Sequence, residues 1–158
     1  MKEIRGSYQG KGKKIAIVIS RFNELVSTKL LEGCLDELIK QGVEQKDISV
    51  VYVPGSFEIP PILTKLCDNK AYDGFIALGA VIRGDTPHFD YIASELAKGI
   101  AQVSLAKKVP VIFGVLTCDS IDQAIERAGA KKGNKGREAA LAAIEMVNLY
   151  KEVEKLKK

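Results

Sequence analysis

The only histidine of the chain, His88, lies where a long apolar run gives way to polar residues. The preceding residues 75–82, FIALGAVI, favour a strand buried on both faces of a parallel sheet. Thr86 and Pro87 then indicate a helix start, with a hydroxyl at the N-cap and proline at the first helical position. Because the positive end of a helix dipole disfavours imidazolium, we expect His88 to be neutral and able to accept a proton. The alternative is a histidine that only completes the helix start.

Phe22 follows a second apolar run, residues 15–19, in the segment SRFN. The ring falls outside the apolar stripe of the helix that comes next. It is therefore either a lid over the core or a flat surface on which a ligand ring can stack. Asn23 is the expected cap of that helix, and Gly42 closes it.

A third run, residues 48–53, ends in a different kind of loop. Pro54 and Gly55 force a sharp turn there, which leaves Ser56 and Glu58 to offer a hydroxyl and a carboxylate. Both groups suit a polyol. The alternative is that they only cap the following helix.

The fourth run covers residues 109–117. Ser120 and Gln123 form a capping box for a short helix that ends near position 129. Arg127 lies in the last turn of that helix, where an arginine complements the helix dipole even without a ligand. A long helix is expected from about position 136 to the end of the chain.

Strand and helix alternate four times, which predicts a three-layer α/β/α sandwich around a mostly parallel four-stranded sheet. Residues 1–13 are expected to form an arm or an extra N-terminal edge strand. The carboxyl ends of parallel strands meet at one edge of a sheet, so the exit loops should converge there. These loops are residues 20–23, 54–58, 83–88 and 117–120. Together they predict a site for a polar, cyclic and phosphorylated ligand.

Composition limits the other possibilities. A chain of 158 residues fits one domain, residues 1–158. Its longest apolar runs hold about eight residues, whereas a membrane helix needs roughly 20, so no membrane-spanning helix is expected. The start of the chain lacks the apolar region of a signal peptide, so we expect a cytoplasmic protein. The net charge of +4 comes from lysines interleaved with acidic residues, which argues against nucleic-acid binding. One histidine and three scattered cysteines indicate neither a metal site nor disulfides, and Cys34 and Cys67 are expected in the core.

Seven ordered segments resemble the 6,7-dimethyl-8-ribityllumazine synthase family: SRFN at 20, VPGSFEIP at 53, GAVIRGDTPHFDY at 79, FGVLT at 113, QAIERAG at 123, GNKG at 133 and AAIEM at 142. The resemblance implies a flavodoxin-like fold and a transferase of the penultimate step of riboflavin biosynthesis. The implied reaction condenses 5-amino-6-(D-ribitylamino)uracil with 3,4-dihydroxy-2-butanone 4-phosphate. Its products are 6,7-dimethyl-8-ribityllumazine, phosphate and water, and neither metal nor organic cofactor is implied.

The resemblance also implies roles for individual residues. His88 would move protons, and Phe22 would stack on the uracil ring. The other implied substrate contacts are Ser56, Phe57 and Glu58 for the ribityl chain, Ala80, Val81 and Ile82 for the pyrimidine, Gly84, Asp85, Thr86 and Arg127 for the phosphate, and Phe113 and Lys135 beside them. Phe113, Arg127 and Lys135 would reach the site from a neighbouring subunit. Asp85 stands where several members carry a small residue, and we expect its carboxylate to point away from the phosphate.

The implied assembly is a homo-oligomer built from pentamers. The short connection between the last two helices resembles that of members forming icosahedral shells of sixty subunits, although pentamers and decamers also occur in the family. Riboflavin synthase is a candidate partner. A flavodoxin-like or receiver domain of another kind is disfavoured because no phospho-accepting aspartate or glycine-rich flavin loop is present. An inactive shell-forming homologue remains the alternative, against which the intact Phe22, His88, Arg127 and Lys135 argue.

Overall fold

The computed structural model describes residues 1–130 and 133–157, and its strands form one parallel sheet. The strands are β1 (Ile15–Ser20), β2 (Ile48–Val53), β3 (Gly74–Ile82) and β4 (Val111–Cys118). Their order is β2-β1-β3-β4, with every neighbouring pair parallel. The apolar run before His88 is therefore the central strand β3, as its composition predicts, and β2 and β4 are the edges of the sheet.

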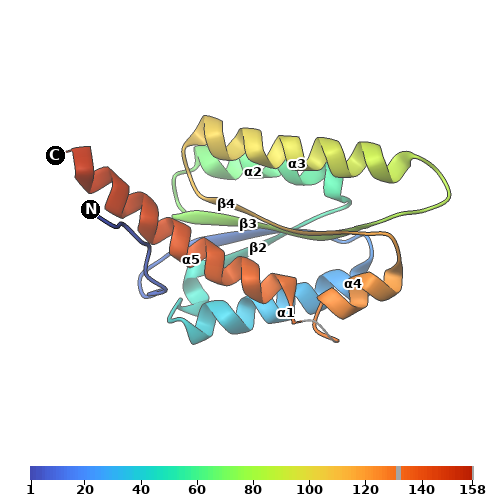
Figure 1. Cartoon of the computed structure of the whole chain (residues 1–158), viewed down its shortest axis with the longest axis horizontal. Coiled ribbons are helices and arrows are strands. Elements are labelled where there is room, and N and C mark those ends of the chain that lie inside the picture. The colour runs from blue at the N-terminus through green and yellow to red at the C-terminus, as the bar shows by residue number, and fades with distance from the viewer. Residues whose placement is uncertain (131–132, 158) are drawn as a thin grey trace.

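Helices cover both faces of the sheet (Figure 1). One face carries α2 (Ile59–Asp68) and α3 (His88–Lys107), and the other carries α1 (Glu24–Lys40), α4 (Ile121–Arg127) and α5 (Lys135–Glu154). Short 3₁₀ turns occupy Gln45–Asp47, Ser56–Glu58 and Lys155–Lys157. The three-layer α/β/α sandwich is confirmed, and the four exit loops of its parallel strands share one end of the sheet.

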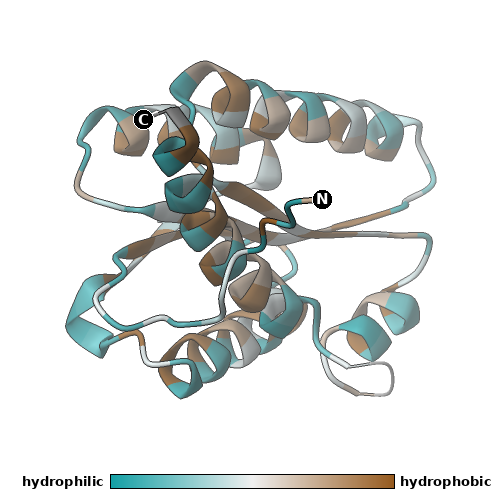
Figure 2. Ribbon diagram, turned by 60° about the vertical axis from the view of Figure 1, so that its left-hand side comes forward, coloured by the Kyte–Doolittle hydropathy of each residue, from teal (hydrophilic) through white to brown (hydrophobic). Residues whose placement is uncertain are grey.

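Two apolar cores lie on opposite faces of the sheet because alternate strand residues point to opposite sides. Ile17 and Leu78 pack with α1 and α5, whereas Val18 and Ala77 pack with α2 and α3. Figure 2 shows the hydrophobic segments of strands and helices gathered between the layers. Cys34 lies in the first core, where burial raises the pKa of its thiol to about 12. Cys34 and Cys67 are buried core residues, as expected.

The expected N-terminal edge strand does not form, and the arm forms in its place. Residues 1–13 contain no strand, and the arm lies against α5 near the C-terminus (Figure 1). The side-chain amide of Asn148 on α5 donates to the carbonyl oxygens of Ser7 at 2.8 Å and of Gln9 at 3.1 Å. These carbonyls are thus satisfied by a helix side chain instead of a strand ladder. Gly6 fits closely here, because a Cβ would collide with the carbonyl oxygen of Glu145.

Candidate active site

Most of the predicted site residues meet in one cavity at the carboxyl ends of the strands. This cavity has a volume of about 540 Å³ and lies between the exits of β1, β2 and β3 and the start of α3. We call it the strand-exit pocket. The predicted residues that line it are Phe22, Ser56, Phe57, Glu58, Ala80, Val81, Ile82, Gly84, Thr86 and His88. Three of the four exit loops that were predicted to converge therefore line this cavity, whereas no residue of the fourth, 117–120, does.

Two aromatic rings stand at the rim of the strand-exit pocket. The exposed fraction is 68% for Phe22 and 60% for Phe57. A ring that is two-thirds exposed does not cover the core, so the first alternative for Phe22 is wrong. The second alternative, a surface on which a planar ligand can stack, fits both its exposure and its place in the pocket wall.

Asn23 differs from its expected role. It occupies the N-cap position of α1 in a left-handed conformation, with φ of 58°, and makes no side-chain capping bond. Its amide instead donates to the carbonyl oxygen of Ala80 at 3.1 Å. Because Ala80 lies in the pocket wall, this bond fixes the exit of β1 against the end of β3. The capping rule missed it because the partner is distant in sequence.

The exit loop of β2 keeps its polar groups available. Ser56 is buried, whereas Glu58 is exposed and makes no side-chain capping bond to α2. A capping role for Glu58 is therefore not what the structure shows. Both residues line the pocket, so a residue with a hydroxyl and a residue with a carboxylate belong to its wall.

The loop of residues 83–88 carries His88 into the pocket. Helix α3 begins at His88 with Pro87 at the N-cap position, and the expected Thr86 cap makes no side-chain bond. His88 and Thr86 are exposed and line the pocket. Asp85, a predicted substrate contact, is exposed and does not line the pocket.

Arg83 holds this loop in place, a role that the sequence analysis missed. Its Nε donates to Asp119 at 2.9 Å, and its guanidinium contacts the Asp90 carboxylate at 3.3 Å. These hydrogen bonds, first to Asp119 and then to Asp90, raise the pKa of Arg83. The guanidinium thereby connects the exit loop of β4 with the first turn of α3, which begins at His88.

Besides Asp85, three predicted residues lie outside the strand-exit pocket. Phe113, Arg127 and Lys135 line a second cavity of about 450 Å³, formed by β4, the end of α4 and the start of α5. We call it the β4-edge pocket. Arg127 Nη1 lies 3.7 Å from the sulfur of Cys118, and Lys135 Nζ lies 3.7 Å from the carboxylate of Glu138. The two pockets share no lining residue. Within a single chain, the predicted residues that line a pocket therefore form two separate groups.

A comparison with protein-family models identifies the family of the chain. The model described as 6,7-dimethyl-8-ribityllumazine synthase matches residues 12–151 of the chain. The chain belongs to this lumazine synthase family. It is accordingly a transferase of riboflavin biosynthesis, and its flavodoxin-like fold agrees with that membership.

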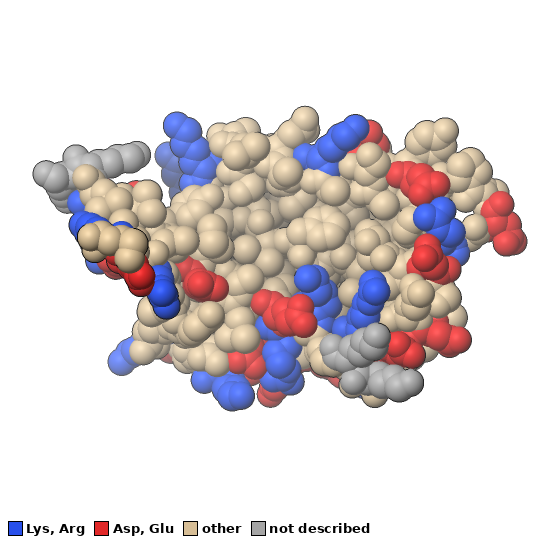
Figure 3. All heavy atoms as spheres, in the orientation of Figure 1, with Lys and Arg blue, Asp and Glu red and all other residues tan. Residues whose placement is uncertain are grey.

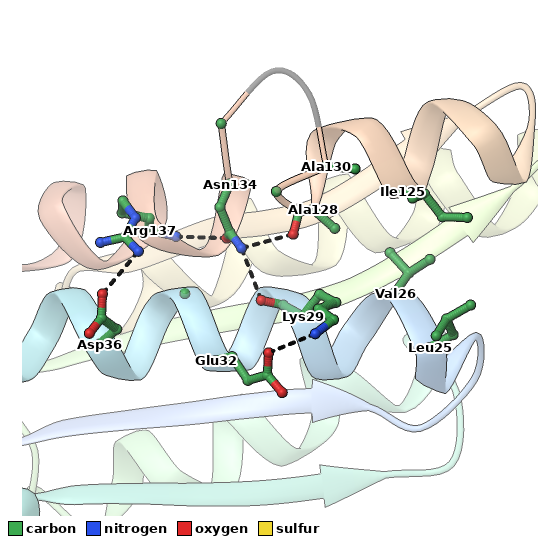
Figure 4. A pocket seen from close by; sticks show the side chains of 13 residues that line it. Leu25, Val26, Lys29, Glu32, Asp36, Ile125, Ala128, Ala130, Asn134 and Arg137 are labelled. Carbon is green, nitrogen blue, oxygen red and sulfur yellow. Dashed lines mark hydrogen bonds and ion pairs between the residues drawn. The ribbon is translucent and has the colours of Figure 1, made fainter.

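A larger cavity lies elsewhere in the chain. It has a volume of about 690 Å³ and lies between α1 and the connection from α4 to α5 (Figure 4). None of the predicted site residues lines it. Its charged side chains pair with one another, Lys29 with Glu32 at 3.2 Å and Arg137 with Asp36 at 2.9 Å. Volume alone therefore does not identify the functional site, and the strand-exit pocket is the candidate because ligands of open parallel sheets bind at the strand ends.

Residues 1–130 and 133–157 contain no cluster of three or more His, Cys, Asp and Glu side chains suited to a metal ion. Among the helices of these same segments, none combines the length and apolar character needed to cross a bilayer.

Proposed function

We propose that this chain condenses 5-amino-6-(D-ribitylamino)uracil with 3,4-dihydroxy-2-butanone 4-phosphate to give 6,7-dimethyl-8-ribityllumazine. The observation that carries the proposal is the meeting of an exposed Phe22, the β3 terminus and His88 around one cavity of about 540 Å³. A cavity of this size is within the range that encloses small ligands. Family membership supports the same reaction.

The uracil ring would stack on Phe22, with the backbone of residues 80–82 reading its polar edge. Strand ends at an open sheet present unpaired backbone groups, which bind a pyrimidine without charged side chains. Ser56 and Glu58 would bind the hydroxyls of the ribityl chain. This arrangement places the two amino groups of the uracil toward the start of α3.

The butanone phosphate would bind at the start of α3. The phosphate suits the N-terminus of this long helix, where N–H groups and the dipole favour an anion. The 5-amino group of the uracil attacks the ketone, and loss of water gives an imine. A C–H proton and the phosphate are then eliminated. The ribitylamino nitrogen finally attacks the remaining carbonyl carbon, and loss of a second water closes the ring. His88 would take and return these protons. Alignment of the two substrates supplies much of the rate, because binding makes the carbon–nitrogen bond formation effectively intramolecular.

The β4-edge pocket of a second copy would complete the site. Its Arg127 binds the phosphate bidentately, with Lys135 beside it and Phe113 as a further wall. Two features support this proposal: the pockets share no lining residue, and a broad area with few charges lies between α3 and α5 on the face shown in Figure 3. A contact between different surfaces of identical chains forms a ring when its rotation closes. On the resemblance to the family we propose that the ring is a pentamer and that sixty subunits build a shell.

The proposed reaction uses no metal or organic cofactor. The proposed setting is the cytoplasm, with riboflavin synthase as a candidate partner, and both rest on the resemblance to the family.

The direct test mixes the purified chain with both substrates and follows the fluorescence of the lumazine, with the butanone phosphate omitted as a control. We expect product only in the complete mixture. Native mass measurement of the same sample reports the assembly. Assembled particles that form no product would refute the proposed function in favour of an inactive shell-forming homologue.

A further inference from the structure

The side-chain amide of Asn134 joins three elements that are separate in the sequence (Figure 4). Its Nδ2 donates to the carbonyl oxygens of Lys29 on α1 at 2.9 Å and of Ala128 at the end of α4 at 3.0 Å. Its Oδ1 accepts from the backbone N–H of Arg137 at 3.1 Å and so caps α5. Both amide hydrogens and the oxygen are therefore used, which fixes the amide in one orientation.

These bonds lie directly beside the two cations of the β4-edge pocket. Ala128 follows Arg127, the last residue of α4, and Asn134 precedes Lys135, the first residue of α5. A backbone bridge between Ala128 and Asn134 accompanies the side-chain bond. The amide thus fixes the end of α4 to the start of α5 across their connection, and fixes both to α1.

Two glycines shape the surfaces that seat this amide. A Cβ on Gly33 of α1 would lie 2.5 Å from atoms of the Asn134 amide. A Cβ on Gly136 of α5 would collide with the carbonyl oxygen of Leu30. Helix α1 therefore approaches the start of α5 closely enough for Asn134 to reach its backbone, and any larger side chain at position 33 would displace the amide.

A helix cap alone does not account for this arrangement. Capping uses only Oδ1, and serine or aspartate would serve as well at that position. The two donor bonds of Nδ2 add nothing to the cap. Together with the backbone bridge between Ala128 and Asn134, they join the end of α4, which carries Arg127, to the start of α5, which carries Lys135.

We propose that Asn134 is a positioning residue that holds Arg127 and Lys135 in the geometry that binds the phosphate of the butanone substrate. The inference rests on the proposed function, in which these two cations face that phosphate. It goes further by assigning the geometry of the pair to a residue that need not touch either substrate.

Three variants separate this role from a purely structural one. Asn134→Ser keeps a capping oxygen and removes the amide donors. Gly33→Ala keeps Asn134 but takes the space of its amide, and alanine otherwise favours a helix. The matched control is Asn148→Ser, because Asn148 also donates from one amide to two backbone carbonyls but does so far from the β4-edge pocket.

The measurements are binding of inorganic phosphate by calorimetry and the KM for each substrate, on the assembled full chain. We expect Asn134→Ser and Gly33→Ala to weaken phosphate binding, and to raise the KM for the butanone phosphate, by about tenfold, the loss expected for one hydrogen bond to a charged group. The KM for the uracil substrate should not change, and Asn148→Ser should bind phosphate as the native chain does. A structural role alone would lower the maximal rate and leave both KM values and the phosphate affinity unchanged.

The outcomes decide this inference separately from the proposed function. Phosphate affinity in Asn134→Ser equal to that of the native chain would overturn the inference, as would a native chain that binds no phosphate. If the native chain binds phosphate more tightly than Asn134→Ser does but forms no lumazine, the positioning of the cations stands and the proposed reaction fails.

Discussion

The guanidinium carbon of Arg83 lies 4.5 Å from the centre of the Phe89 ring. A cation over an aromatic face is attracted by the ring quadrupole. Phe89 also lines the strand-exit pocket and follows His88 directly. Together with the bonds to Asp119 and Asp90, this stacking gives Arg83 three contacts, two of which are with the first turn of α3.

Replacing Arg83 should therefore impair catalysis from outside the pocket. We expect Arg83→Met to lower kcat/KM by roughly tenfold to a hundredfold, because small displacements of a reacting group have effects of this size. The assay is lumazine formation. Lys98→Met is the matched control, since it removes another exposed cation that pairs with a carboxylate on α3. Equal activities of the two variants would show that Arg83 does not orient the site.

Removal of the imidazole should slow the reaction without abolishing it. We expect His88→Ala to lower kcat by about a hundredfold, which is at the lower end of what a general acid–base group contributes. The remaining rate would come from alignment of the two substrates. Steady-state kinetics with both substrates saturating provides the number. A variant that assembles normally and shows no turnover would contradict the dominant role of alignment.

Loss of Arg127 should mainly weaken binding of the phosphate substrate. If the site is shared between copies, variants of the two pockets should also complement each other. When His88→Ala and Arg127→Ala chains are co-expressed, about a quarter of random head-to-tail contacts join an intact strand-exit pocket to an intact β4-edge pocket. We expect the mixed oligomer to be far more active than either variant alone. The control pairs His88→Ala with Phe22→Ala, two changes in the same pocket, which cannot complement. No recovery in the first mixture would place the whole site in one chain.

Buried Glu37 should make stability depend on pH. Its carboxylate accepts from Gln41 at 2.7 Å and from Arg137 at 2.9 Å, and these bonds, Gln41 first, lower its pKa below the ordinary value of 4.5. A depressed pKa contributes stability that is fully present above the ordinary value and lost as pH falls through the folded-state value.

Thermal unfolding at neutral pH and at about pH 3 tests this contribution. We expect Glu37→Gln to be less stable than the native chain at neutral pH and to lose less stability on acidification. Glu32→Gln is the control, because Glu32 is an exposed carboxylate of the same helix. Parallel acid profiles for the native chain and Glu37→Gln would rule out this contribution.

The sheet and the main pocket were predictable because their signals are local. Each buried run marks a strand, and parallel strands bring their exits together whatever the loops contain, so Phe22 and His88 were expected near one another. The N-cap at Ser120 is confirmed as well, with its hydroxyl accepting from the backbone N–H of Gln123 at 3.2 Å, whereas the Gln123 side chain accepts from the backbone N–H of Asp119 and not from that of Ser120. Residue type and spacing were sufficient in these cases.

The residues that were missed act across long sequence separations. Asn23 was expected to cap its own helix, but its amide bonds to Ala80. Arg83 was placed only in an exit loop, although it connects Asp119 to α3. Asn134 could have been found as the cap of α5 from its type and position, but no local pattern indicates its bond to Lys29. Tertiary packing brings these partners together, and no fixed spacing in the sequence relates one partner to the other.

The separation of the strand-exit pocket from the β4-edge pocket has a kinetic consequence. On the proposed function, one copy holds the imidazole and the stacking ring while the guanidinium beside them belongs to another copy, so encounter between copies precedes chemistry. In a dilution series, the initial rate should then rise with more than the first power of protein concentration until assembly is complete, and become proportional to it beyond that point. The activity at a given protein concentration would then depend on the concentration at which copies associate as well as on the turnover number.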